Sequence, residues 1–255
     1  MKIRSFVAVP LAAMTLVAGC TATVGGAAIP APDVTPRPLT GATVGHVLLG
    51  DRALSRIVKR SLNIDPRFPP RFGGAEELQD DATALPDGCR GVASMLQQSV
   101  YRSADVKEVA VETWRHAAPT PDVTGVTEGV VSLPTAADAG ALFASFSRQW
   151  RGCDGAVTSL PGGVFRLKGK ITNVQVSSSV LAATVSIGWT SGSAEPEADS
   201  IPAARAIGIR GNCLIEVEVD FFDGSSASGS ANPGNLNGTA VDIARAMMDK
   251  IGALI

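Results

Sequence analysis

Three carboxylates alternate near the end of the sequence, in the run CLIEVEVDF. Glu216, Glu218 and Asp220 stand two residues apart, so in a β-strand their side chains project from one face. Such a row can line a cleft for a cationic ligand or a divalent ion. A two-residue hairpin turn would place Arg205 opposite Glu218, and an exposed pair of this kind contributes only about 0–1 kcal/mol to stability. We interpret the row first as a solvated strand face, and we retain Arg205, Glu216 and Glu218 as candidate ligand-binding residues.

The large aromatic side chains form a second set of candidates. Trp150 falls on the apolar side of a predicted helix, so we assign it to the core. Trp114 and Trp189 stand near the ends of predicted strands and are candidates for lining a ligand pocket, although core packing is the commoner role of tryptophan. His116 follows closely on Trp114, and we interpret it as a surface or hydrogen-bonded histidine rather than a ligand.

The sequence shows no motif for catalysis. Its only histidines, His46 and His116, stand in no His-Glu-x-x-His or paired-cysteine pattern, so we expect no metal site. No Gly-x-Ser-x-Gly nucleophile motif occurs. The stretch from Gly163 to Lys170 resembles a phosphate-binding loop, but it has one residue too many and lacks the metal-binding hydroxyl. We therefore expect no catalytic residue, no metal and no cofactor, and a protein that is not an enzyme.

The charge balance argues against one class of partner. The chain of 255 residues carries 22 Lys and Arg against 24 Asp and Glu, and the basic residues are scattered along it. A nucleic-acid-binding protein presents a basic patch or stripe, so we expect no binding to nucleic acid.

The N-terminus predicts where the protein works. Residues 1–20 begin with Lys2 and Arg4, continue with an apolar run too short to span a bilayer, and end in the lipobox-like sequence Val-Ala-Gly-Cys. We expect residues 1–19 to be a cleaved lipoprotein signal peptide and Cys20 to be lipidated. Each buried methylene contributes roughly 0.8 kcal/mol to membrane binding, so two or three acyl chains would hold the protein on the extracytoplasmic face of the cell membrane. The alternative is an ordinary secretory signal in which Cys20 stands by chance.

The segment after the lipobox is predicted to be a tether. Residues 20–40 contain four prolines and almost no large apolar side chain, so they cannot form a core. Chains of this composition stay extended at about 3 Å per residue. We expect them to hold a single globular domain, residues 41–255, at a distance from the membrane.

The remainder predicts a mixed α/β (α+β) domain. Apolar residues recur at helical spacing over residues 51–62, 90–101, 135–150 and 239–255. Strands are predicted over residues 106–115, 126–133, 171–176, 180–189, 205–210 and 213–222. Thr135 and Asp138 stand at the capping-box interval, which marks the start of the third helix. Residues 63–88 contain paired prolines and glycines and are interpreted as a long irregular connection.

Three cysteines follow Cys20, so at most one disulfide can form between them within the chain. If consecutive elements alternate in direction, Cys89 and Cys153 lie at the same end of the domain, and we predict a structural bridge between them. Closing a loop of about 65 residues contributes roughly 4 kcal/mol in the chain-entropy description. Cys213 alternates with apolar residues of its strand and is interpreted as a small core residue. A bridge from Cys213 to either of the others is the alternative.

Several short motifs occur in an order that resembles the PknH-like extracellular sensor domain. They are Cys89, QQSVY at residues 97–101, Trp114, WRGC at residues 150–153, Arg-Ala-Ile at residues 205–207, Gly-Asn at residues 211–212 and the last Ile-Ala-Arg helix. This family includes the extracellular part of a mycobacterial receptor kinase and a set of mycobacterial lipoproteins. The resemblance implies a twisted, mainly antiparallel sheet with helices packed on one face and an open cleft on the other for an unknown ligand. Kinase-linked members carry two further cysteines where this chain has Ala203 and about Asp220.

These observations predict a class of function rather than a ligand. We expect a cell-envelope lipoprotein with a non-catalytic, sensor-like domain that binds a small molecule, a lipid or another envelope component. A lipid or glycolipid carrier, which needs a large apolar cavity, is the first alternative. An envelope hydrolase that uses carboxylates such as Glu216 and Glu218 is the second, and it needs two acids with shifted pKa values at one opening.

Overall fold

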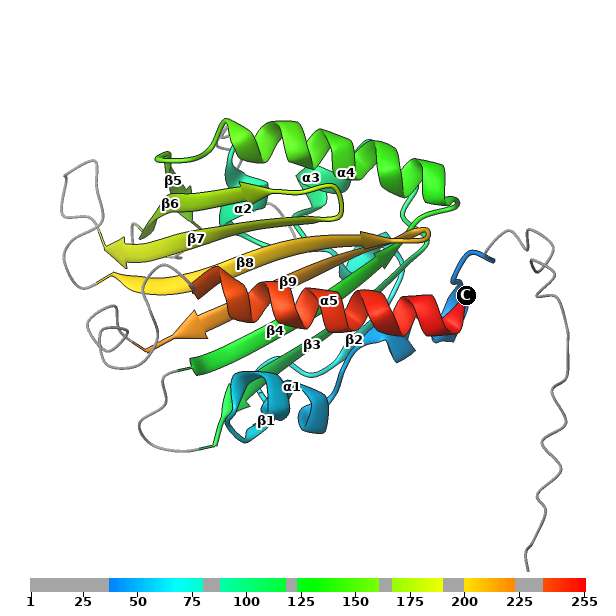
Figure 1. Cartoon of the computed structure of the whole chain (residues 1–255), viewed down its shortest axis with the longest axis horizontal. Helices are drawn as coiled ribbons and strands as arrows, with labels where there is room; N and C mark the ends of the chain where they lie inside the picture. Colours follow the sequence, from blue (N-terminus) through cyan, green and yellow to red (C-terminus); the bar gives the residue numbers. More distant parts are fainter. Residues whose placement is uncertain (1–36, 80–87, 118–122, 161–166, 190–199, 223–235) are drawn as a thin grey trace, which may run out of the picture. The chain divides into compact units, whose positions relative to one another are not determined.

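A single antiparallel sheet organises the domain. The structure is a computed structural model that describes residues 37–79, 88–117, 123–160, 167–189, 200–222 and 236–255 (Figure 1). Its strands are β1 (Leu62–Ile64), β2 (Arg71–Gly73), β3 (Glu108–His116), β4 (Val123–Ser132), β5 (Val157–Leu160), β6 (Leu167–Val176), β7 (Val180–Trp189), β8 (Ile201–Arg210) and β9 (Cys213–Phe221). Their order is β1-β3-β4-β9-β8-β7-β6-β5, with β2 also paired to β3. Neighbouring strands in this order are antiparallel, as predicted.

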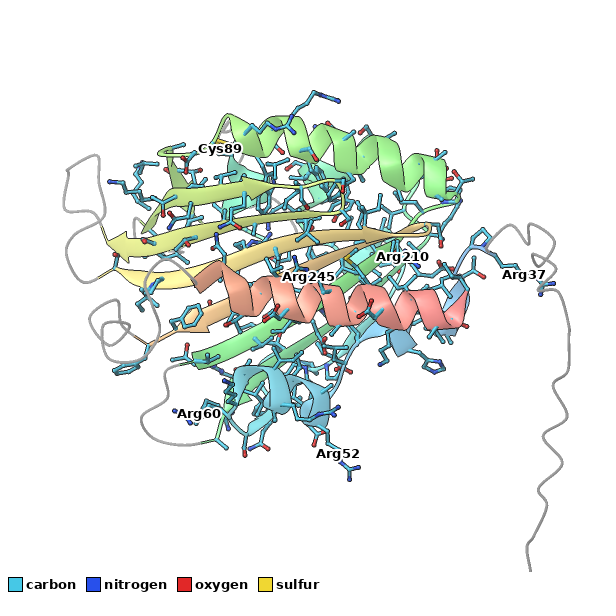
Figure 2. All side chains as sticks on the ribbon, in the orientation of Figure 1. Arg37, Arg52, Arg60, Cys89, Arg210 and Arg245 are labelled. Carbon is cyan, nitrogen blue, oxygen red and sulfur yellow. A yellow bond between two sulfur atoms is a disulfide. The ribbon has the colours of Figure 1, made fainter. Side chains whose placement is uncertain are left out.

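The helical segments are short except for two. They are η1 (Gly41–Val47), α1 (Asp51–Val58), η2 (Ala75–Glu77), α2 (Arg90–Ala93), α3 (Gln98–Tyr101), α4 (Ala136–Arg151) and α5 (Leu236–Leu254). Among the described residues, no helix is long and apolar enough to cross a membrane. The polar sides of the helices face solvent, and Arg52 of α1, for example, is exposed and points away from the sheet (Figure 2).

One face of the sheet is covered by α5, α1 and η1. The core residues of α5 (Ala240, Ile243, Ala244, Met247 and Ile251) pack with the inward side chains of β9, among them Ile215, Val217 and Val219. In Figure 1, α5 lies across the strands of this face. A Cβ atom at Gly208 of β8 would lie 2.9 Å from Met248 Sδ, so the close approach of α5 to the sheet needs a glycine there.

The opposite face is covered in part by α2, α3 and α4. Leu142, Phe143, Phe146 and Trp150 of α4 belong to a second core with Leu181, Val185, Ile207 and Leu214 of the sheet. The ring of Tyr101 meets Phe146 edge to face, with 5.6 Å between the ring centroids. Helices therefore pack on both faces. The predicted arrangement with helices on one face only is wrong, because β8 and β9 carry apolar side chains on both sides and each set needs a cover.

The long helices and the central strands agree with the sequence prediction. Thr135 is the N-cap of α4, and its hydroxyl accepts a hydrogen bond from the amide of Asp138 at 3.1 Å. The predicted hairpin is formed by β8 and β9, whose register places Arg205 opposite Glu218 and Ala203 opposite Asp220. The turn between them begins at Gly211, which has a φ of 56°.

The predicted helix over residues 90–101 is interrupted. It forms α2 and α3 with residues 94–97 between them, here called the crossing segment. Leu96 in this segment has a φ of 54°, and a Cβ atom at Gly129 of β4 would lie 2.8 Å from its Cδ1 atom. Gln97 also forms a parallel bridge with Gln79. The chain therefore leaves the helical path because the crossing segment lies directly on the sheet.

The connection at residues 63–88 is more regular than predicted over its described part. The predicted first helix ends early, at Val58, with Lys59 in the left-handed conformation as its C-cap. The chain then forms β1 and β2, each of three residues and each paired with β3. These pairings hold the loop between β1 and β2 against the sheet.

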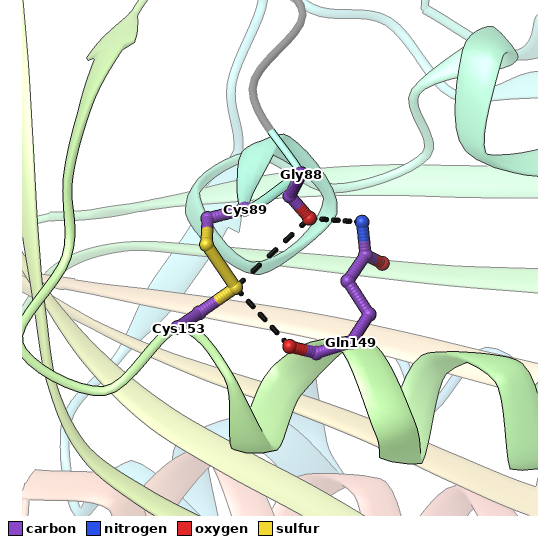
Figure 3. The surroundings of a disulfide bond; sticks show 4 residues. All are labelled: Gly88, Cys89, Gln149 and Cys153. Atoms are coloured by element: carbon purple, nitrogen blue, oxygen red, sulfur yellow. Dashed lines mark hydrogen bonds between the residues drawn. A yellow bond between two sulfur atoms is a disulfide. The ribbon is translucent and has the colours of Figure 1, made fainter.

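The predicted disulfide joins Cys89 to Cys153, with 5.6 Å between the Cα atoms. It links the start of α2 to the residue that follows the last turn of α4, where the side-chain amide of Gln149 also donates a hydrogen bond to the carbonyl of Gly88 (Figure 3). Cys213 is free and fully buried, as expected of a small core residue. Burial raises the pKa of the Cys213 thiol to about 12, so it stays protonated and unreactive.

Candidate functional site

A cavity of about 750 Å³ opens on the sheet face that also carries α2, α3 and α4. Met95 and Val111 belong both to its lining and to the core under those helices, which places the cavity beside them. Its walls are the loop between β1 and β2, the crossing segment, and strands β3, β4 and β9. The predicted cleft therefore lies on a helix-bearing face, in the part that the helices leave uncovered, and not on a face free of helices.

Two carboxylates of β9 line the cavity. Glu218 and Asp220 alternate on the strand and project into it. Glu218 Oε2 lies 3.6 Å from Nη1 of Arg205. Burial raises the pKa of Asp220 to about 7, helped by repulsion from Glu218 and opposed by Arg205. Burial also raises the pKa of Glu218, while Arg205 lowers it and Glu216 raises it further. Acids with raised pKa values in an open cavity are typical of functional sites.

The raised pKa of Asp220 predicts a loss of stability as the pH rises from about 4 to about 7. The usual value is 3.8 and the folded value about 7, so the folded state binds more protons than the unfolded state between them. The free energy of unfolding then falls with rising pH and levels off above the folded pKa. Asp220→Asn should reduce the slope of this dependence in urea denaturation series, while Glu128 and Glu218, whose pKa values are also raised by burial, retain their part of it. Asp242→Asn, at an exposed position of α5, should retain it, and equal slopes in both variants would refute the assignment.

Behind the carboxylates lies a buried ionic network. Arg205 is fully buried, and its Nη2 lies 2.8 Å from Glu216 Oε2. The Tyr101 hydroxyl donates to Glu216 Oε1 at 2.6 Å, and the Leu96 amide donates to Oε2 at 3.1 Å. Arg205 Nε donates to the carbonyl of Val92 at 3.2 Å. Burial and the neighbouring Glu216 raise the pKa of Tyr101 well above its usual range, so its hydroxyl keeps the proton that it donates.

The network corrects the interpretation of the acidic row as a solvated strand face. Glu216 is 2% exposed, and only Glu218 and Asp220 retain partial exposure. Arg205 faces Glu218 across the hairpin as predicted, but it does so from the interior. Arg205 thus joins the sheet to α2 and Glu216 joins it to the crossing segment, whereas Glu218 lines the cavity itself.

The loop between β1 and β2 forms the wall opposite β9. Its Asp65 carboxylate accepts hydrogen bonds from the backbone and the guanidinium of Arg67, with Nη2 at 2.6 Å from Oδ2. The side-chain hydrogen bond from Arg67 lowers the pKa of Asp65 to about 2. Arg71 is tied by a hydrogen bond of 2.9 Å to the carbonyl of Glu77. Phe68 remains 56% exposed at the cavity. The wall is thus fixed by its own ion pairs and presents an aromatic ring.

The two tryptophan candidates have different outcomes. Trp114 borders the cavity but is 7% exposed and belongs to the core under α5. Its indole N–H donates to Glu128 at 3.3 Å, a buried carboxyl that also accepts from the amide of Leu49 at 3.0 Å. Burial raises the pKa of Glu128 to about 7. The side chain of Trp189 lies outside the described part of the structure.

Several cavity residues were not among the sequence candidates. They are Asp65, Arg67, Phe68, Arg71, Arg115 and Asp220. Asp220 is the third member of the acidic row. Arg67, Phe68 and Arg71 belong to the repeated Arg-Phe pairs of DPRFPPRF, which stand out in a segment poor in large side chains. That repeat is the one sequence feature that marks this wall.

Comparison with known proteins supports the fold. The structure of the extracellular domain of PknH from Mycobacterium tuberculosis matches with a TM-score of 0.67 and 15% identity, over 86% of this chain and 99% of that chain. Structures of proteins from Rhizobium loti (13% identity, 49% of this chain and 98% of that chain) and Mycobacterium smegmatis (10% identity, 54% and 97%) reach TM-scores of only 0.23. A search of curated proteins gives no match.

Fold and cavity together define an α+β domain built on one open antiparallel sheet, with a charged cavity at the uncovered part of one face. Residues 39–250 match the family described as PknH-like extracellular domain, and the chain belongs to this family. Membership agrees with a domain that works outside the cytoplasm.

Proposed function

We propose that this protein is a lipid-anchored component of the cell envelope whose domain binds a small ligand in the cavity between the β1–β2 loop and strands β3, β4 and β9. The observation that carries the proposal is the cavity itself. Its volume of about 750 Å³ lies within the range of about 300–1,000 Å³ typical of small-molecule sites. Its lining combines charged groups with apolar side chains such as Val111 and Phe68. A binding domain needs such a site and no catalytic group.

The lining argues against the lipid carrier. Six charged side chains border the cavity, three arginines and three carboxylates. Burying an acyl chain against them would desolvate charged groups without giving them new partners. A modest cavity with a polar rim fits a sensor-like domain better than a carrier.

Native mass spectrometry of the protein isolated from its own envelope tests the proposal. We expect a bound small molecule in the wild type and in Asp242→Asn, and its loss in Asp220→Asn. Recovery of the protein with bound diacyl or glycolipid would favour the carrier instead. An equal ligand load in both variants would exclude the cavity as the binding site.

A hydrolase is a second candidate because two acids with raised pKa values face one opening. The pair is Glu218 and Asp220, since Glu216 is already bonded to Arg205 and Tyr101. A hydrolase should convert the co-purified molecule on incubation, and Glu218→Gln should stop this conversion without releasing the molecule. An unchanged mass after long incubation would support pure binding.

Lipid anchoring through Cys20 predicts a change of location on substitution. Wild-type protein should take up labelled palmitate and sediment with membranes. Cys20→Ser should take up none and appear in the soluble envelope fraction, because loss of the acyl chains removes several kcal/mol of membrane affinity. Cys213→Ser, at a buried free cysteine, serves as the control for labelling. Palmitate uptake by Cys20→Ser would contradict the proposed site.

A further inference from the structure

The cavity described above carries balanced charges, and this balance bears on its ligand. The inference rests on the proposed binding function. Asp65, Glu218 and Asp220 are matched in number by Arg67, Arg71 and Arg115. Asp65 is neutralised by Arg67 at 2.6 Å, and Arg71 lies 3.6 Å from Glu77. A site that selected a cation or an anion would present an excess of the opposite charge. This lining presents donors and acceptors side by side instead.

The carboxylates of β9 have acceptor capacity to spare. Among the described residues, no donor makes a hydrogen bond to the carboxylate of Asp220, and the carboxylate of Glu218 has only the guanidinium of Arg205, 3.6 Å away. An ionised carboxylate offers about four lone-pair sites. Hydroxyl groups are well suited to fill such sites, because they bring a donor without bringing a charge.

A buried donor lies directly behind these acceptors. Nη1 of Arg205 makes no hydrogen bond within the described residues, although the side chain is fully buried. It is directed toward Glu218, on the lining of the cavity. A buried donor that makes no hydrogen bond is unfavourable for the folded state. Arg205 does not line the cavity, so its guanidinium acts on a ligand through Glu218, whose carboxylate it faces from the interior.

An exposed aromatic ring completes the site. Phe68 is 56% exposed and lines the cavity, beside Pro69. One side of its ring is approached by the guanidinium of Arg67, 5.7 Å from the ring centroid. A ring exposed beside a polar cavity offers an apolar platform for a ligand that has a nonpolar face as well as polar edges.

We propose that the cavity binds a neutral saccharide, with its hydroxyl groups on Glu218 and Asp220 and the C–H face of a sugar ring on Phe68. Sugars combine paired donor and acceptor hydroxyls with an apolar ring face and carry no charge. These are the properties that the lining matches.

The test uses the full chain in detergent on an array of neutral mono- and oligosaccharides, followed by titration calorimetry of the best binder. Asp220→Asn should weaken binding about tenfold or more, since it removes a hydrogen bond to a charged group. Phe68→Ala should weaken binding about threefold or more, since it removes the aromatic platform for the sugar ring. Asp242→Asn and Phe72→Ala are matched controls, because Asp242 and Phe72 are exposed and lie outside the cavity lining. Both controls should bind within about twofold of wild type.

The outcomes separate this inference from the proposed function. Spermidine and citrate are the cationic and anionic probes in the same experiment. Tight binding of either one, with loss of this binding in Asp220→Asn and no sugar bound, would overturn the saccharide assignment and leave a ligand-binding cavity in place. Sugar binding that is weakened equally by the cavity variants and the controls would also overturn it. Binding to none of the three probe classes would count against the saccharide inference, and the co-purified ligand would then decide the proposed function.

Discussion

Glu216→Gln is expected to lower the free energy of unfolding by about 3–5 kcal/mol, because it removes the charge that compensates the buried Arg205. Arg205 and Glu216 lie 2.8 Å apart with side-chain exposures of 0% and 3%. Water cannot replace the lost partner at such a position. The loss should appear as a lower midpoint in urea denaturation followed by circular dichroism.

Glu218→Gln is the matched control for this prediction. It removes a carboxylate two residues away on the same strand and face, but its side chain is 23% exposed and Arg205 is 3.6 Å away. We expect a change below about 1 kcal/mol. The double variant Arg205→Met/Glu216→Leu should recover only part of the stability: it removes both buried charges, but it leaves the Tyr101 hydroxyl and the Leu96 amide without their acceptor. Similar losses in Glu216→Gln and Glu218→Gln would show that the buried pair has no special role.

Glu216→Gln should also loosen the crossing segment, which forms one wall of the cavity. Glu216 accepts the amide of Leu96, which lies in the crossing segment next to Met95 of the lining. Hydrogen exchange over residues 94–97 should therefore accelerate in Glu216→Gln and remain slow in Glu218→Gln. The hydrogen bond from Leu96 to Glu216 thus holds the crossing segment, and with it the cavity wall at Met95, against the sheet.

Removal of the disulfide is the second large effect, with an expected loss of about 2–5 kcal/mol for Cys89→Ser/Cys153→Ser. The bridge spans 64 positions in sequence, and opening it frees the unfolded chain. It also unties α2, and with it the start of the crossing segment, from the end of α4. Denaturation in urea with and without reductant measures the effect on the wild type and should leave the double variant unchanged.

Thiol labelling provides the control. Among Cys89, Cys153 and Cys213, we expect no labelling in the native state, one label after unfolding without reductant, and three after unfolding with reductant. The single label should be on Cys213, which is buried. Labelling of Cys89 in native protein would contradict the bridge.

Local sequence features predicted the elements whose signals are local. The N-cap of α4 at Thr135 and the β8–β9 turn at Gly211 depend on residues a few positions apart. The Cys89–Cys153 pairing followed from the alternating direction of the consecutive helices and strands between the two cysteines. The break in helix 90–101 was not predictable in this way, because it depends on contact between Leu96 and Gly129 of a distant strand. The strands β1 and β2 are too short for periodicity and exist through pairing with β3.

In the candidate site, too, only the features with local sequence signals were predicted. Alternation placed Glu216, Glu218 and Asp220 on one face correctly, and hairpin register placed Arg205 opposite Glu218. Whether that face is solvated depends on what crosses it, and the crossing segment buries Glu216 while leaving Glu218 at the cavity. The wall with Asp65 and Phe68 comes from a segment whose local signals indicate only turns. Long-range packing therefore decides which of the acids are buried in the network and which line the cavity.

Backbone amide chemical shifts of the full chain, recorded with and without the co-purified ligand, test the binding cavity most directly. We expect the largest changes in residues 113–115 of β3, 124–127 of β4 and 218–220 of β9, and at Phe68 on the facing loop. Residues of α5 on the opposite face should change little. If the largest changes fell in α5 or α4 and none at Glu218 and Asp220, the cavity would not be the ligand-binding site.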